Sequence, residues 1–189
     1  MKYRDFFKNL FKEKDFIYDN LSSRVKEELD YHLSFYKSEL LSLMDKCESP
    51  IEQLFALSLK DGVEQLRNSL YVFGADCDVN FYPQKQIVVR DKKYRVDFVL
   101  SVTSSEQSKE YVVECDGHNF HEKTKEQAAR DRERERRLMS LGYTVIRFTG
   151  SEIWKDPSKC VRQLMDIVNS DFKINEAWAS RAEEDMKGK

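Results

Sequence analysis

The sequence contains few of the residues that cross-link or interrupt a chain. Its 189 residues include four cysteines, six glycines and three prolines. The cysteines are widely separated and form no CxxC pair, which argues against a zinc ribbon or a dense disulfide framework. They are Cys47, Cys77, Cys115 and Cys160. We interpret this pattern as that of a reduced, cytoplasmic protein.

Long apolar runs are also missing. No segment has the apolar core of a signal peptide or the length of a membrane span, so we expect no membrane association. The chain is 40% hydrophobic and 35% charged, with a net charge of -2. This composition predicts a globular protein with long solvated helices, and its near-neutral balance neither indicates nor excludes a polyanionic partner.

Residues 1–48 predict an N-terminal helical extension. Residues 1–46 contain no glycine or proline, and apolar side chains recur at steps of three and four. These are Leu29, Leu33, Tyr36, Leu40 and Leu43. We expect this face to pack on the body of the same protein, with a homodimer or another protein partner as the alternative. The aromatic stripe Phe6, Phe7 and Phe11 has the same interpretation, and a membrane-surface helix is the weaker one.

Residues 49–170 predict an α/β domain, followed by a polar tail over 171–189. A helix begins at "SPIE", where Ser49 suits the cap and Pro50 the first turn. Strands are predicted over 78–89, 93–102 and 110–116, then a charged helix over 123–140, a strand over 143–150 and a helix over 156–170. This order predicts a small mixed sheet flanked by helices.

Three acids stand out on the predicted strands. Side chains alternate along a strand, so Glu114 and Asp116 share one face while Cys115 packs in the core. In "YRVDFVL" the same alternation places Tyr94, Val96, Phe98 and Leu100 on one face, and Arg95, Asp97 and Val99 on the other. Burying an unpaired carboxylate costs several kcal/mol, so Asp97 should lie beside a cation, a hydrogen-bond network or a metal.

Acids on neighbouring strands can hold a hard divalent cation between their oxygens. Magnesium prefers a few carboxylates and keeps several waters, and it can lower the pKa of a bound water that attacks a phosphorus. Two like charges on one face repel unless a cation lies between them, which favours a metal over an ordinary polar strand end.

The element order and these acids resemble the PD-(D/E)XK nuclease superfamily. The likeness is greater to the branch related to very-short-patch-repair endonucleases and their uncharacterised bacterial relatives, and it covers about residues 49–169. It rests on "SPIEQLF", "YRVDFVL", "VVECDGHNFH" and "RDRERERRLMSLGYTVIRFTGSEI". The resemblance implies a restriction-endonuclease-like αβββαβ fold and a Mg²⁺-dependent DNA endonuclease in which Mn²⁺ can substitute.

The resemblance also implies roles for individual residues. Asp97 and Glu114 would ligate the metal, assisted by the backbone carbonyl of Cys115, and Glu52 would ligate it or orient a metal-bound water. The departure is Asp116, which stands where the superfamily carries a lysine and cannot supply a positive charge. His121 would act as a base or as a donor to phosphate.

Several alternatives stay open for the remaining groups. Asp116 can orient the His121 imidazole or join the metal shell, and Gln86 or Lys125 can replace the missing lysine. Glu52 can instead complete a capping box with Ser49. Asp97 can instead form an ion pair, with Arg95 or Arg147 as its partner.

Two further readings concern the histidines and the charged helix. Zinc bound by Cys115, His118 and His121 is disfavoured, because the strand turns the cysteine away from the acids and no second cysteine–histidine pair exists. The helix over 123–140 places Arg130, Arg134 and Arg137 on one side, with Glu133 four residues before Arg137. Its interleaved acids predict a solvated, salt-bridged face. Lys123, Lys125 and Arg130 are nonetheless candidates for contacts with DNA phosphates.

The alternative to a nuclease is a nuclease-fold module that binds nucleic acid or a partner protein without efficient chemistry.

Overall fold

The computed structural model describes residues 22–72, 77–117 and 124–174. The chain divides into two compact units, Met1–Ser42 and Leu43–Lys189. The described part of the first unit belongs to helix α2 (Ser23–Asp45), whose last turn lies in the second unit. The stripe of Phe6, Phe7 and Phe11 and the side chains of Leu29 and Leu33 lie outside the described residues. The packing of this extension therefore stays a prediction.

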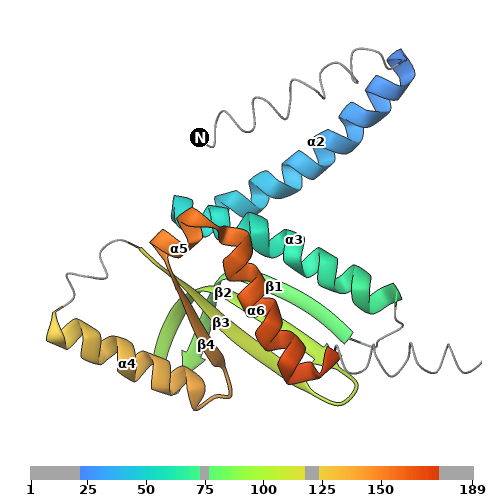
Figure 1. The fold of residues 1–189 in the computed structure, drawn as a ribbon. Helices are drawn as coiled ribbons and strands as arrows, with labels where there is room; N and C mark the ends of the chain where they lie inside the picture. Colours follow the sequence, from blue (N-terminus) through green and yellow to red (C-terminus); the bar gives the residue numbers. More distant parts are fainter. Residues whose placement is uncertain (1–21, 73–76, 118–123, 175–189) are drawn as a thin grey trace, which may run out of the picture. The chain divides into compact units, whose positions relative to one another are not determined.

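The second unit follows the predicted element order. Helix α3 (Pro50–Val72) precedes strands β1 (Cys77–Val89), β2 (Lys92–Ser104) and β3 (Ser108–Asp116). Helix α4 (Lys125–Met139), strand β4 (Thr144–Thr149), the short helix α5 (Gly150–Lys155) and helix α6 (Pro157–Phe172) complete it (Figure 1). The predicted α/β class is confirmed, and α5 is an element that the sequence patterns did not resolve.

The four strands form one mixed sheet in the order β1-β2-β3-β4. Strands β1, β2 and β3 pair antiparallel as a meander, and the first turn contains Arg90 in a left-handed conformation with φ 57°. Strand β4 pairs parallel with β3, since α4 carries the chain back between them. The β3–β4 register places Glu114 beside Arg147 and Asp116 beside Thr149.

Each face of the sheet has its own apolar cluster. On one face α3, α5 and α6 cover an aromatic centre in which the Phe55 ring lies 5.4 Å from that of Phe98 and 5.6 Å from that of Phe148. A smaller cluster on the other face includes Leu138 of α4, with Val99 and Val112 of the sheet. The acids of β3 must therefore lie on the α4 face, because Val112, Glu114 and Asp116 share one side of the strand.

One prediction about strand β2 is wrong. Tyr94 and Val96 belong to the α4-side cluster, whereas Phe98 and Leu100 belong to the opposite one. The strands change face at Gln84 and Asp97, the two positions left out of an otherwise continuous β1–β2 pairing. Gln84 has φ 51°, a left-handed conformation that interrupts the pleat, and it follows Pro83 on an edge strand.

Candidate active site

Asp97 lies where the β2–β3 pairing ends. The last paired residues there are Phe98 and Val113, and beyond them the Asp97 carboxylate accepts a hydrogen bond from the backbone N–H of Cys115 at 2.7 Å. The carboxylate thus replaces the carbonyl that a continuing strand would offer. Because the pleat is interrupted at Asp97, its side chain points to the end of the β2–β3 pairing instead of into either apolar cluster.

Glu52 reaches the same region from the first turn of α3. Its carboxylate accepts bonds from the Ser49 hydroxyl at 2.7 Å and the Glu48 N–H at 2.9 Å, and its own N–H donates to the Ser49 hydroxyl. Ser49 therefore caps the helix through the Glu52 N–H, and the Glu52 carboxylate bonds the Glu48 N–H rather than the Ser49 N–H of a complete capping box. The same carboxylate also accepts from the Gln84 amide at 2.7 Å, which ties the helix start to the irregular point of β1. Glu52 is 7% exposed.

Glu114 is held by an arginine of α4. Both guanidinium NH₂ groups of Arg134 donate to the carboxylate, at 3.1 Å to one oxygen and 2.8 Å to the other. Arg134 also donates to the backbone carbonyl of Arg95 at 2.6 Å. The Glu114 side chain is 10% exposed and that of Arg134 23%. This forked pair is partly desolvated, which makes it stronger than a surface ion pair.

Asp116 also has an arginine partner. The Arg147 side chain on β4 donates through Nε at 2.9 Å and through a terminal NH₂ at 2.5 Å to the two carboxylate oxygens. Arg147 thus forms an ion pair with Asp116, and Arg95 forms an ion pair with Glu48 at 2.5 Å. Neither arginine forms the ion pair with Asp97 that the sequence left open as an alternative. Positive charge at the end of β3 comes from neighbouring elements instead of from within the strand.

The charges of Glu52 and Glu114 both act on Asp97, and we call these three residues the converging acids. Burial raises the pKa of Asp97 to about 7; the Cys115 N–H and Arg134 oppose this rise, and the charges of Glu114 and Glu52 add to it. Burial also raises the pKa of Glu114, against the effect of Arg134. The pKa of the Cys115 thiol is raised by burial and then by Asp97, Glu52 and Glu114. Cys115 itself packs into the α3-side core, as its strand position predicted.

The donor set has the chemistry of a magnesium site but not its geometry. Glu52, Asp97 and Glu114 offer hard carboxylate oxygens, and Asp97 bears a charge that its surroundings disfavour. Among the described residues, no three His, Cys, Asp or Glu side chains are grouped as metal ligands. Arg134 donates to both oxygens of Glu114, so a metal ligated there would share these oxygens with the guanidinium or displace it.

The other predicted site residues fall into two groups. His118, His121 and Lys123 lie outside the described residues. Gln86 is exposed on β1 and faces Arg95 across the ladder; it is Gln84, two residues earlier, that contacts Glu52. The sequence patterns did not single out Gln84, although Pro83 in a strand is a signal of irregularity.

Helix α4 presents an uneven charge to solvent. Its exposed charged side chains are those of Lys125, Glu126, Arg130, Arg132 and Arg136. The remaining acids of this helix are half-buried, and one of them, Glu133, pairs with Arg137 at 2.5 Å. The predicted intrahelical salt bridge is therefore confirmed, but the outer face of the helix is basic rather than balanced.

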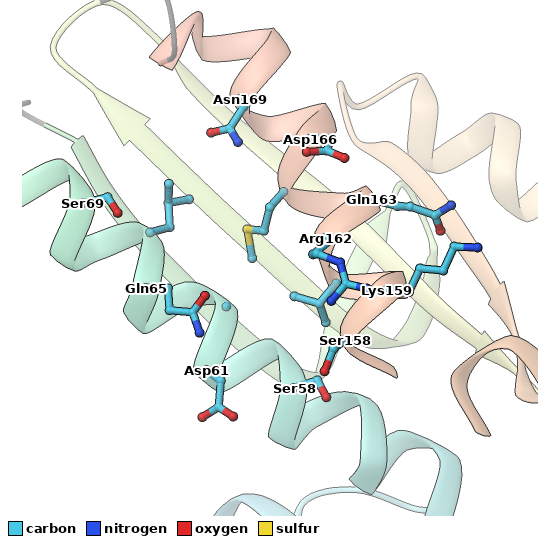
Figure 2. Close-up of a pocket in the computed structure, with 14 residues that line it drawn as sticks. Ser58, Asp61, Gln65, Ser69, Ser158, Lys159, Arg162, Gln163, Asp166 and Asn169 are labelled. Carbon is cyan, nitrogen blue, oxygen red and sulfur yellow. The ribbon is translucent and has the colours of Figure 1, made fainter. Parts of the chain in front are cut away.

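A separate groove runs between α3 and α6. It has a volume of about 770 Å³ and is lined by polar side chains of both helices, including Asp61, Gln65, Arg162 and Asn169 (Figure 2). Of the predicted site residues that the structure describes, none lines this groove. It is distinct from the converging acids at the ends of β2 and β3.

A mixed sheet with one parallel edge strand, helices on both faces and acids gathered where β2 and β3 separate defines a restriction-endonuclease-like α/β domain. Residues 78–168 match the model of the restriction-endonuclease-like family REase_MTES_1575, so over these residues the chain is similar to this nuclease superfamily. No curated protein and no solved structure matches the chain. No helix within the described residues has the length and apolar character needed to cross a membrane.

Proposed function

We propose that this protein is a metal-dependent nuclease that hydrolyses phosphodiester bonds in DNA. The observation that carries the proposal is the position of Asp97. Its carboxylate bonds the N–H of Cys115, next to Glu114, within the residues 78–168 that match a restriction-endonuclease-like family. The charges of Glu114 and of Glu52 on α3 both act on it. Acids buried together without a structural need are costly, and such clusters are found where function requires them.

The acids have two roles: some ligate the metal and one orients a water molecule. Asp97 and Glu114 are the metal ligands, helped by the backbone carbonyl of Cys115, and Glu52 orients a water from the α3 side. The metal, Mg²⁺ or Mn²⁺, would supply an activated water and neutralise charge on the phosphoryl oxygens. Gln84 fixes one oxygen of Glu52, so its role is to position that carboxylate.

The basic outer face of α4 supports DNA as the substrate. Lys125, Arg132 and Arg136 are exposed on one side of the helix, and Arg130 is exposed on another side. Exposed cations along a helix can contact a phosphate backbone without reading sequence. Affinity for DNA should therefore fall as salt rises, with a smaller dependence in the double variant Lys125→Ala, Arg130→Ala.

Calorimetric titration with Mn²⁺ and Mg²⁺ tests the metal site directly. Binding that disappears in Asp97→Ala and persists in the exposed-acid control Asp166→Asn supports the proposal. Equal binding by wild type and Asp97→Ala refutes the assignment of the ligand. Incubation with plasmid, linear duplex and single-stranded DNA plus Mn²⁺ then tests the chemistry, with Asp97→Ala as the inactive control.

One observation favours a second function. Arg134 and Arg147 neutralise Glu114 and Asp116, and an acid cluster satisfied in this way suits a domain that binds nucleic acid without cutting it. Retention of DNA without cleavage of any substrate, in the presence of Mn²⁺, would favour this binding module over the nuclease.

A further inference from the structure

The contact between Arg134 and Glu114 places a cation where the proposed function needs a metal. The guanidinium binds both oxygens of Glu114, and it also lowers the pKa of the neighbouring Asp97. One side chain therefore relieves the repulsion within the acid pair, which is the electrostatic task of a divalent ion at the same position.

We propose that Arg134 is a built-in competitor of the metal, and that metal binding at Glu114 requires its guanidinium to withdraw. This inference rests on the proposed function and adds a regulatory step to it. In the metal-free protein the site is closed by an ion pair from α4. The divalent ion and the guanidinium then exclude each other through shared oxygens and like charge.

The surroundings of Arg134 allow such an exchange. Its side chain is 23% exposed, so the guanidinium is not sealed in the core and can turn toward solvent. Its other contact is the backbone carbonyl of Arg95, at the end of the regular part of β2 next to the face change. Because this bond is made only while Arg134 points inward, withdrawal of the guanidinium also frees the strand beside Asp97.

Competition makes a prediction that a purely structural ion pair does not. Two ligands that exclude each other have a negative coupling, so removing one tightens the other. Arg134→Gln should bind Mn²⁺ about tenfold more tightly than wild type. The same variant should melt at a lower temperature without metal, because Glu114 loses its partner, and should regain stability when Mn²⁺ is added.

The test compares four proteins by calorimetry and thermal melting with and without Mn²⁺. They are wild type, Arg134→Gln, Arg134→Lys and Arg137→Gln. Arg137 lies on the same helix and pairs with Glu133, away from the converging acids, which makes it the matched control. Arg134→Lys keeps a charge without the fork and covers the case in which the glutamine variant does not fold.

Tighter Mn²⁺ binding in Arg134→Gln, and a smaller gain in Arg134→Lys, with wild-type affinity in Arg137→Gln, supports the competition. Affinities equal to wild type in the Arg134 variants overturn it; if wild-type binding still depends on Asp97, the proposed function stands. Loss of melting temperature that Mn²⁺ does not restore also overturns the inference. If neither wild type nor any Arg134 variant binds Mn²⁺, the proposed function fails as well.

Discussion

Replacing Asp97 by asparagine should stabilise the metal-free protein at neutral and alkaline pH. Asparagine has nearly the same shape, and its side-chain oxygen can still accept the bond from the Cys115 N–H. The substitution removes the charge whose burial raises the pKa of Asp97 to about 7. Most substitutions of part-buried residues destabilise a protein, so a gain here is diagnostic.

The size and the pH range follow from that pKa. A carboxyl group whose pKa rises from 3.8 to about 7 on folding costs nothing below pH 3.8 and costs most above pH 7. Each pKa unit corresponds to about 1.4 kcal/mol, which sets a ceiling of about 4 kcal/mol. We expect about 2 kcal/mol at pH 8, because the new amide NH₂ also needs a partner.

Urea denaturation of wild type and Asp97→Asn between pH 4 and pH 8 measures the difference. The advantage of the variant should grow as pH rises from 4 through 7 and then level off. Asp166→Asn, at an exposed acid of α6, controls for the loss of one negative charge. A constant difference at every pH indicates a packing effect, and a less stable variant at pH 8 refutes the reasoning.

Three further predictions concern packing and ion pairs. Gly62→Ala should destabilise the protein by about 1–3 kcal/mol in urea, since the new Cβ would lie 2.5 Å from Val161 Cγ1; a gain in stability contradicts the close α3–α6 contact. Tyr111→Phe should cost about 1–2 kcal/mol by thermal melting, since its hydroxyl donates to Asp171 at 2.7 Å; no change would show that water replaces the bond equally well. A double-mutant cycle of Asp116→Asn and Arg147→Ala should give a coupling of about 1–2 kcal/mol, and additivity would show that the pair does not act as a unit.

The sequence predicted the architecture because its elements carry local signals. The start of α3 was predicted from Ser49, Pro50 and Glu52. A central strand was predicted from the apolar run before Glu114. Strand alternation also separated Cys115, which packs in the core, from Glu114 and Asp116 on the other face. These features depend on neighbours in the chain, which a sequence displays directly.

What the sequence did not predict arises from contacts between distant residues. Alternation alone continued through Asp97, whereas the strand changes face there because Gln84 on the adjacent strand adopts a left-handed conformation. Arg134 was grouped with Arg130 and Arg137 as part of a solvated helix face. Only packing of α4 against the sheet directs Arg134 inward to Glu114, 20 residues away in the chain.

The partners of the acids explain why an aspartate is tolerated where the superfamily that the chain resembles carries a lysine. Asp116 binds the Arg147 guanidinium, so the end of β3 still has a positive charge beside it, supplied by β4. Of the acids on β2 and β3, Glu114 and Asp116 are thus each neutralised by an arginine, whereas Asp97 is bound through the backbone N–H of Cys115. A backbone dipole offsets less charge than a guanidinium, and burial raises the pKa of Asp97 to about 7. Within the described residues, and among Asp97, Glu114 and Asp116, Asp97 is therefore the acid without an arginine bound to its carboxylate, and the proposed function assigns it to the metal. For this reason Asp97, rather than Asp116, is the residue to change first.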